Sequence, residues 1–197
     1  MDVCELLEAA SLLVPEGIAA KSDITVNDVW EYLVHDEWEI ALSLLEELGD
    51  VRPLPLGFWQ ALATAAEHMR LERSTAWCHW RGHEARHGII RADLTLRPAH
   101  EGRRRTPFSG AGVLRPMWNT GRRTPTGEPD LRIARLWAEF APLVEPGGRA
   151  TVRLAPLSPS NWQHLQPGQV ITMHEDRTVA GTAVVLDVQR PPAPSAS

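Results

Sequence analysis

The spacing of apolar residues changes near Asp93, and this change constrains the fold more than any other feature of the sequence. In residues 1–92 apolar side chains recur at helical spacing over long runs. In residues 93–189 they form short alternating runs, and Pro or Gly interrupts them every few residues. We therefore expect an α+β multidomain protein, in which a small N-terminal helical bundle precedes an antiparallel β-barrel or sandwich.

Residues 1–92 are predicted to be helical. The predicted helical stretches cover residues 6–13, 29–33, 38–48, 57–69 and 72–87. Either Thr25 or Asn27 is the expected N-cap of the second helix, and Gly49 is expected to stop the third. Five of the eight Trp residues fall in this half, and we interpret them as bundle core rather than as a ligand site, because a small bundle needs large side chains to bury enough area. These are Trp30, Trp38, Trp59, Trp77 and Trp80.

The predicted strands of residues 93–189 contain the apolar runs at 94–96, 131–136, 150–154, 170–173 and 184–188. The first of these strands is expected near Asp93. Residues 190–197 are rich in Pro and Ser and are predicted to form a disordered tail.

The two halves differ in charge. Residues 1–92 contain 7 basic and 16 acidic side chains, whereas residues 93–197 contain 13 basic and 9 acidic ones. Lys21 is the single lysine, so nearly every cation is an Arg, whose planar fork suits phosphate and carboxylate. We expect the acidic half to repel RNA and to suit a basic protein partner.

Several classes of protein are excluded by composition. No run of about 18 apolar residues is present, which argues against a membrane span. The N-terminal residues 1–5 carry acids where a secretory or mitochondrial signal carries bases, so we expect a cytoplasmic protein. Cys4 and Cys78 are interpreted as small buried hydrophobes rather than as a disulfide or part of a metal site.

Three stretches of the second half occur along the chain in the same order as similar stretches of a known protein domain. They are Gly102-Arg103-Arg104-Arg105-Thr106-Pro107-Phe108 with Arg115-Pro116, then residues 144–152, which contain Pro-Gly-Gly before a strand, and then residues 175–185, which contain Arg-Thr-Val-Ala-Gly. In this order they resemble the C-terminal β-barrel domain of translation elongation factor Tu. The resemblance implies a barrel over about residues 93–189, with no counterpart for the helical half.

The resemblance also implies partners. In that family the barrel helps to hold tRNA and meets a translation-factor protein, and contacts to an RNA stem go mainly to sugar and phosphate. The resemblance makes Arg103, Arg104, Arg105 and Arg115 candidate partner-binding residues. The alternative is that Arg103, Arg104 and Arg105 form a solvated loop and that Arg115 is ion-paired against the barrel for structural reasons. Ser109, Leu114 and Met117-Trp118 depart from the family pattern, so the barrel can be kept while the binding surface has changed.

GTP hydrolysis by the elongation factor mechanism is excluded. That mechanism needs a loop of the type G-x-x-x-x-G-K-[ST] to hold the phosphates, and no such loop surrounds Lys21.

The sequence His83-Glu84-Ala85-Arg86-His87 matches H-E-x-x-H, in which two imidazoles on one helix face bind zinc and the Glu activates water. His79 extends the stripe by one turn. This pattern suggests either a zinc-dependent hydrolase or a structural metal site at these three His residues. However, no third zinc ligand follows His87 at the usual distance, and a His in the last turn before Gly88 also suits a helix C-terminus.

Three hypotheses follow. The first is a non-catalytic binding protein whose barrel contacts tRNA or a translation-factor protein, with no catalytic residue and no resident cofactor. The second is an immunity or antitoxin-like protein that binds a basic protein toxin. The third is the zinc-dependent hydrolase.

Overall fold

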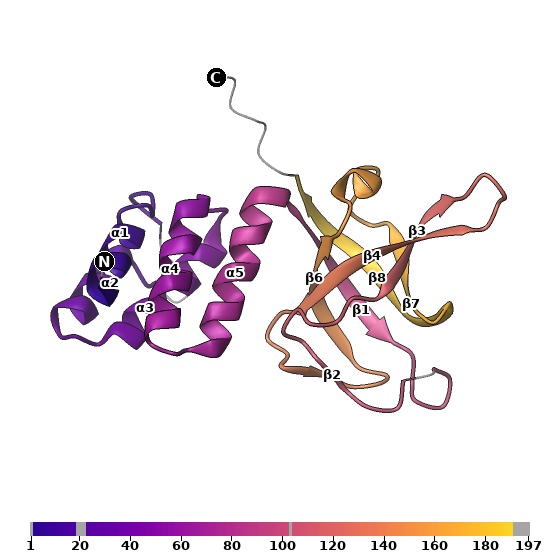
Figure 1. The fold of residues 1–197 in the computed structure, drawn as a ribbon, viewed down its shortest axis with the longest axis horizontal. Coiled ribbons are helices and arrows are strands. Elements are labelled where there is room, and N and C mark those ends of the chain that lie inside the picture. Colours follow the sequence, from indigo (N-terminus) through magenta and orange to yellow (C-terminus); the bar gives the residue numbers. More distant parts are fainter. Residues whose placement is uncertain (1, 19–22, 103, 191–197) are drawn as a thin grey trace, which may run out of the picture. The chain divides into compact units, whose positions relative to one another are not determined.

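The computed structural model describes residues 2–18, 23–102 and 104–190 (Figure 1). The chain divides into two compact units, Met1–Arg86 and His87–Ser197, which we call the helical unit and the barrel unit. Most of the predicted tail, residues 191–197, lies outside the described residues. None of the helices in the described part of the chain is long and apolar enough to cross a membrane.

The described residues form five α-helices before the first strand. They are α1 (Val3–Ser11), α2 (Val26–Val34), α3 (Trp38–Val51), α4 (Leu56–His68) and α5 (Glu72–His87). Capping boxes fix the starts of α1 and α2. At α1 the Asp2 carboxylate accepts a hydrogen bond of 2.9 Å from the Glu5 backbone N–H. At α2 the Asp28 carboxylate accepts one of 2.6 Å from the Thr25 backbone N–H. Of the two predicted caps of α2, Thr25 is therefore the one used.

Two expectations about helix ends were wrong. Helix α1 ends at Ser11, which leaves Leu13 beyond the helix and 41% exposed. Helix α3 continues through Gly49 to Val51. A Cβ atom at Gly49 would lie 2.4 Å from Cη2 of Trp59, so this glycine makes room for the indole ring instead of stopping the helix.

The core of the helical unit is built on leucines and aromatic rings. Phe58 and Trp59 pack edge to face at 4.9 Å between ring centroids. Trp59 is buried in the main core cluster, and Trp30 and Trp38 are partly buried against it, as the bundle-core interpretation requires. Trp80 is buried but is not a member of this cluster, and Trp77 is only partly buried, with the Arg81 guanidinium over its ring. Further fully buried members of the core are Leu7, Leu42, Leu45, Leu48 and Leu62.

The barrel unit contains eight strands within its described residues. They are β1 (Ile89–Leu96), β2 (Phe108–Ser109), β3 (Met117–Arg123), β4 (Pro129–Ala138), β5 (Leu143–Val144), β6 (Arg149–Pro156), β7 (Val170–Glu175) and β8 (Thr178–Gln189). Six of the described strands close an antiparallel barrel in the order β1-β6-β4-β3-β7-β8, and β8 returns to pair with β1. Strands β2 and β5 form a separate small sheet. The prediction of helices followed by an antiparallel barrel is confirmed at this level.

Strand β1 begins four residues before the predicted strand start at Asp93. Gly88 has a φ of +76°, which lets the chain leave α5 and enter β1 directly at Ile89. Along β1 the side chains of Ile90, Ala92 and Leu94 are buried in the barrel core. Ile89 is buried as well, so the alternation of buried and less buried side chains starts at Ile90.

One glycine of the barrel unit is required by close packing. A Cβ atom at Gly110 would lie 2.1 Å from the carbonyl oxygen of Ala141 and 2.9 Å from Cβ of Ala138. The Gly110 N–H donates to Pro142 at 2.9 Å, and its carbonyl accepts from Ala138 at 2.8 Å. These contacts hold the segment after β2 against the end of β4.

Candidate functional site

The loop between β1 and β2, residues 97–107, carries most of the predicted partner-binding arginines, and we call it the arginine loop. Arg104 is held inside the barrel unit: its Nε donates to Glu175 Oε1 at 2.8 Å, its guanidinium lies 5.2 Å from the Phe108 ring, and its side chain is only 21% exposed. Arg103 lies outside the described residues. The geometry therefore gives Arg104 a role in fixing the loop to β7.

Arg105 and Arg115 are exposed. Arg105 donates to the Ala99 carbonyl across the loop. No carboxylate of the described residues forms an ion pair with Arg115, so the ion pair of the alternative interpretation is not seen there. Burial lowers the pKa of Arg135, and the charge of Arg115 lowers it further.

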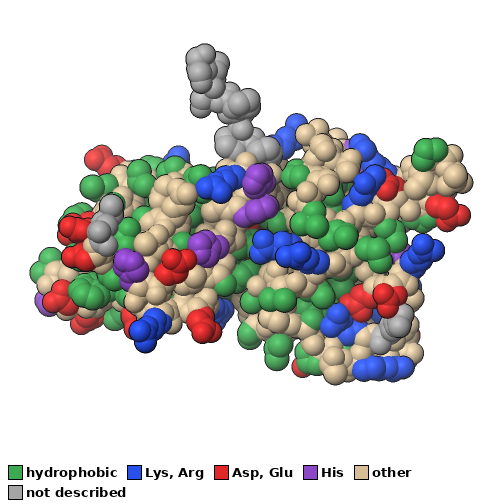
Figure 2. Space-filling view, viewed as in Figure 1, with side chains coloured by type: hydrophobic (Ala, Val, Ile, Leu, Met, Phe, Trp, Pro, Cys, Tyr) green, Lys and Arg blue, Asp and Glu red, His purple; other side chains and the backbone are tan. Residues whose placement is uncertain are grey.

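The space-filling view agrees with the difference in charge. Figure 2 shows red Asp and Glu side chains gathered around the first helices, and blue Arg side chains together with some red ones over the barrel strands. The helical unit contains 16 Asp and Glu but six Lys and Arg. The two units therefore differ in net charge.

The Glu of the H-E-x-x-H sequence is engaged in the fold. Glu84 is 7% exposed, and its Oε1 accepts a hydrogen bond of 2.5 Å from Trp80 Nε1. Its other oxygen, Oε2, lies 3.0 Å from Arg81 Nε. A carboxylate that is held by an indole N–H and a guanidinium has no free oxygen directed at a water molecule on the helix surface.

Arg81 is the centre of this buried cluster. Its guanidinium lies 4.3 Å from the Trp59 ring centroid and 5.2 Å from that of Trp77. It also donates to the Gly49 carbonyl at 2.9 Å and to the Asp50 carboxylate. Arg81 therefore links α5 to the C-terminal end of α3, and Glu84 supplies part of its compensating charge.

The three His residues are not brought together as a metal site. His79 is exposed and bonded through Nε2 to the Glu67 carboxylate at 2.8 Å, His83 is half-buried, and His87 is exposed at the end of α5. Within the residues that the structure describes, no group of three His, Cys, Asp or Glu side chains is arranged to hold a metal ion. A zinc centre of the H-E-x-x-H type needs three protein ligands around one point.

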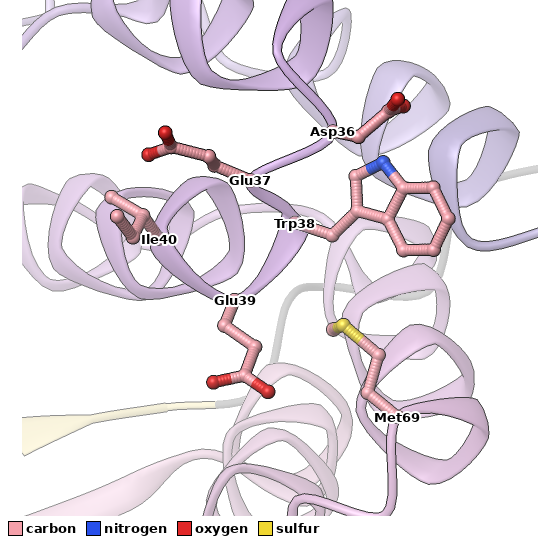
Figure 3. A pocket seen from close by; sticks show the side chains of 6 residues that line it. All are labelled: Asp36, Glu37, Trp38, Glu39, Ile40 and Met69. Atoms are coloured by element: carbon pink, nitrogen blue, oxygen red, sulfur yellow. The ribbon is translucent and has the colours of Figure 1, made fainter.

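A pocket lies on the helical unit, and sequence reasoning missed it. It is about 450 Å³ in volume and is lined by Asp36, Glu37, Trp38, Glu39, Ile40 and Met69; we call it the acidic pocket (Figure 3). Residues 36–40 cover the turn between α2 and α3 and the first turn of α3, whereas Met69 follows α4. The acidic residues at 36–39 were noticeable in the sequence, but nothing there indicated that Met69 lies beside them.

The two thiols are separate and weakly acidic. Burial raises the pKa of Cys78, and the neighbouring Glu46 raises it further through a contact of 3.4 Å between Sγ and Oε1. Burial and Glu8 likewise raise the pKa of Cys4. Both cysteines are free thiols, with Cys78 buried and Cys4 half-buried, so neither has the features of a reactive nucleophile.

The sequence matches no protein-family model and no curated protein.

Proposed function

We propose that this protein is a non-catalytic binding protein whose barrel, similar to the C-terminal domain of elongation factor Tu, contacts tRNA or a translation-factor protein. The observation that carries the proposal is an arginine loop attached to a closed antiparallel barrel, with Arg104 fixed by Glu175 and Arg105 exposed beside it. Exposed arginines on a rigid scaffold suit phosphate oxygens, because each guanidinium offers several donors in a fixed plane.

A tRNA-binding titration tests this proposal. We expect the full chain to bind tRNA with an affinity that falls as salt rises, and the double variant Arg105→Ala/Arg115→Ala to reduce the salt dependence by about one to two phosphate contacts. The matched control is Arg149→Ala, because the exposed Arg149 is already paired with Asp93 at 2.8 Å. If the control weakens binding as much as the double variant, the assigned surface is wrong.

The alternative partner, a translation-factor protein, needs a separate measurement. A pull-down from the native host with nuclease treatment removes tRNA and leaves protein contacts intact. A translation factor retained after this treatment supports the protein partner, whereas loss of every translation component in both conditions contradicts the translation proposal.

A second candidate function is supported by the acidic pocket. A unit with 16 acidic and six basic residues, and with a pocket bordered by three carboxylates, suits a basic protein such as a protein toxin. In this function the protein is immunity or antitoxin-like and covers a basic surface. Coexpression with a basic toxin encoded beside its gene tests the idea, because protection of the cell and a stable complex are both expected.

We do not propose the zinc-dependent hydrolase. The carboxylate that would activate water, Glu84, is buried between Trp80 and Arg81. Metal analysis of protein purified without a His-tag checks this directly: a full equivalent of zinc that is lost on replacing His83 and His87 would restore the hydrolase as a candidate.

A further inference from the structure

We propose that residues 157–169 form a strap that opens at one end of the barrel and lets water reach polar groups that the closed strap leaves without partners. The strap joins β6 to β7 and contains a short 3₁₀ helix, Pro159–Trp162. In Figure 1 it lies at the end of the barrel where β6 ends and β7 begins. The strap belongs entirely to the barrel unit, and its opening requires none of the partners proposed above.

Buried apolar side chains and paired ends hold the strap closed. Trp162 and Leu165 are each 2% exposed and belong to the core of the barrel. Near the two ends of the strap, the backbone N–H groups of Leu157 and Gly168 donate to carbonyl oxygens of β4 and β8 at 3.1 and 2.8 Å. The strap is therefore fixed to the sheet at its ends, and opening concerns the residues between them.

The middle of the strap contacts β3 through an imidazole ring that is paired on one side. His164 Nε2 donates to the carbonyl oxygen of Thr120 at 3.0 Å. Because Nε2 carries the proton in this bond, Nδ1 of the neutral ring is an acceptor that needs a donor. The buried Nδ1 atom finds no donor in the described part of the chain.

Three more polar atoms are buried at this end of the barrel without a partner. They are Trp162 Nε1 on the strap and Trp118 Nε1 and Thr120 Oγ1 on β3, and none of them forms a hydrogen bond with a residue that the structure describes. Trp118 is fully buried and Thr120 is 6% exposed. Trp118 and Trp162 belong to the same core cluster, so strap and strand meet where these groups lie.

Two opposing contributions decide whether the strap stays closed. Burial of Trp162 and Leu165 favours the closed strap. The four unpaired polar atoms oppose it, because a buried donor or acceptor loses the hydrogen bond that water would supply and regains it when the segment opens. Segments of this kind open locally without unfolding of the whole domain, and a partner that binds the uncovered groups would shift the balance towards the open strap.

Native-state hydrogen exchange of the full chain, read by mass spectrometry, tests the proposal. The reporters are the N–H groups of Leu165 and Gly168, which are hydrogen-bonded in the closed strap. We expect them to exchange at least about tenfold faster than the paired amides of β1 and β6. Exchange at the rate of those strands would mean that the strap opens only when the barrel unfolds.

Replacing the Thr120 hydroxyl tests the cause of opening. Thr120→Val keeps the shape of the side chain and removes the unpaired hydroxyl, so we expect exchange at Leu165 and Gly168 to slow by at least about fivefold. Thr120→Ser keeps the hydroxyl and is not expected to slow exchange. The matched control is Thr172→Val in β7, because the Thr172 hydroxyl lies 2.8 Å from His174 Nε2 and its loss breaks an existing hydrogen bond.

The sign of the Thr120→Val effect decides the outcome. Unchanged or faster exchange at the strap would overturn the proposal, because it would show that the hydroxyl has a partner in the closed protein or stays buried when the strap moves. Equal slowing by Thr120→Ser or by Thr172→Val would also overturn it, since the unpaired hydroxyl would then not be the cause. Protection of the β1 and β6 amides in each variant shows that the barrel is still folded.

Discussion

Replacing Glu84 tests whether this residue belongs to the fold or to a catalytic centre. Glu84→Ala removes the acceptor of the Trp80 N–H and the carboxylate beside Arg81, both in a buried environment. An unsatisfied buried donor costs about 1–3 kcal/mol, and breaking a buried ion pair costs about 3–5 kcal/mol. Arg81 keeps Asp50 and the Gly49 carbonyl, so we expect a combined loss of about 4 kcal/mol in the free energy of unfolding.

Glu84→Gln separates the two contributions. The glutamine oxygen still accepts from Trp80, so only the charge beside Arg81 is lost, and we expect a decrease of about 2 kcal/mol. Against a typical stability of about 5–15 kcal/mol, both losses are measurable. The matched control is Glu31→Ala, because Glu31 is exposed in the middle of α2 and its replacement should change stability by less than about 0.5 kcal/mol.

The assay is urea denaturation followed by far-ultraviolet circular dichroism. This signal follows the unfolding of helices α1 to α5, and Glu84 lies in α5. The midpoint should fall while the slope with denaturant stays constant. If Glu84→Ala costs less than about 1 kcal/mol, the buried-cluster interpretation is refuted. A catalytic glutamate would behave in that way, because its replacement removes activity and leaves the fold stable.

Three further predictions concern single groups. Gly110→Ala should destabilise the barrel unit by about 3 kcal/mol in thermal melts because its Cβ has no space, whereas Gly57→Ala, on an exposed helical position, should stabilise by about 0.5–1 kcal/mol. A thiol reagent at mildly alkaline pH should label Cys4 in the native protein but Cys78 only after unfolding, since burial raises the pKa of the Cys78 thiol and shields it; equal labelling rates would contradict this. Burial raises the pKa of the Glu46 carboxyl in the folded protein. The contribution of this group to the free energy of unfolding is therefore fully present below the ordinary pKa of a glutamate, and it is lost as the pH rises through the raised pKa. Glu46→Gln should therefore increase stability to urea at neutral pH and remove this part of the pH dependence; an unchanged profile would contradict the assignment.

Local pattern predicted much of the fold, because helices and strands with one buried face show that face in their sequence period. Strand β3 was not predicted because its sequence does not show this period. Its buried side chains are Trp118 and Thr120, so a polar residue takes one core position and the apolar alternation disappears. Gly49 was misinterpreted because a glycine that stops a helix and a glycine that admits a ring from α4 look the same along the chain.

The candidate sites were harder to predict because they depend on partners distant in sequence. Arg104 resembles a free phosphate ligand until Glu175 is placed beside it, 71 residues later. Glu84 matches a zinc-enzyme pattern through its neighbours in sequence, whereas its contact with Arg81 places it in a cluster that includes Trp59 from α4. Short motifs specify residue types at a spacing but not which side chains already have partners.

Closure of the barrel has a consequence for how the chain folds during synthesis. Strand β1 pairs with β8, so Ile89 and Gln189 become neighbours only after every intervening strand exists. While a ribosome is still making β7, the edge of β1 that β8 will cover has no partner, and unpaired edges invite association with other chains. The helices use contacts closer in sequence and are complete earlier. Released chains that end before Thr178 should therefore aggregate more than chains that include β8 through Gln189.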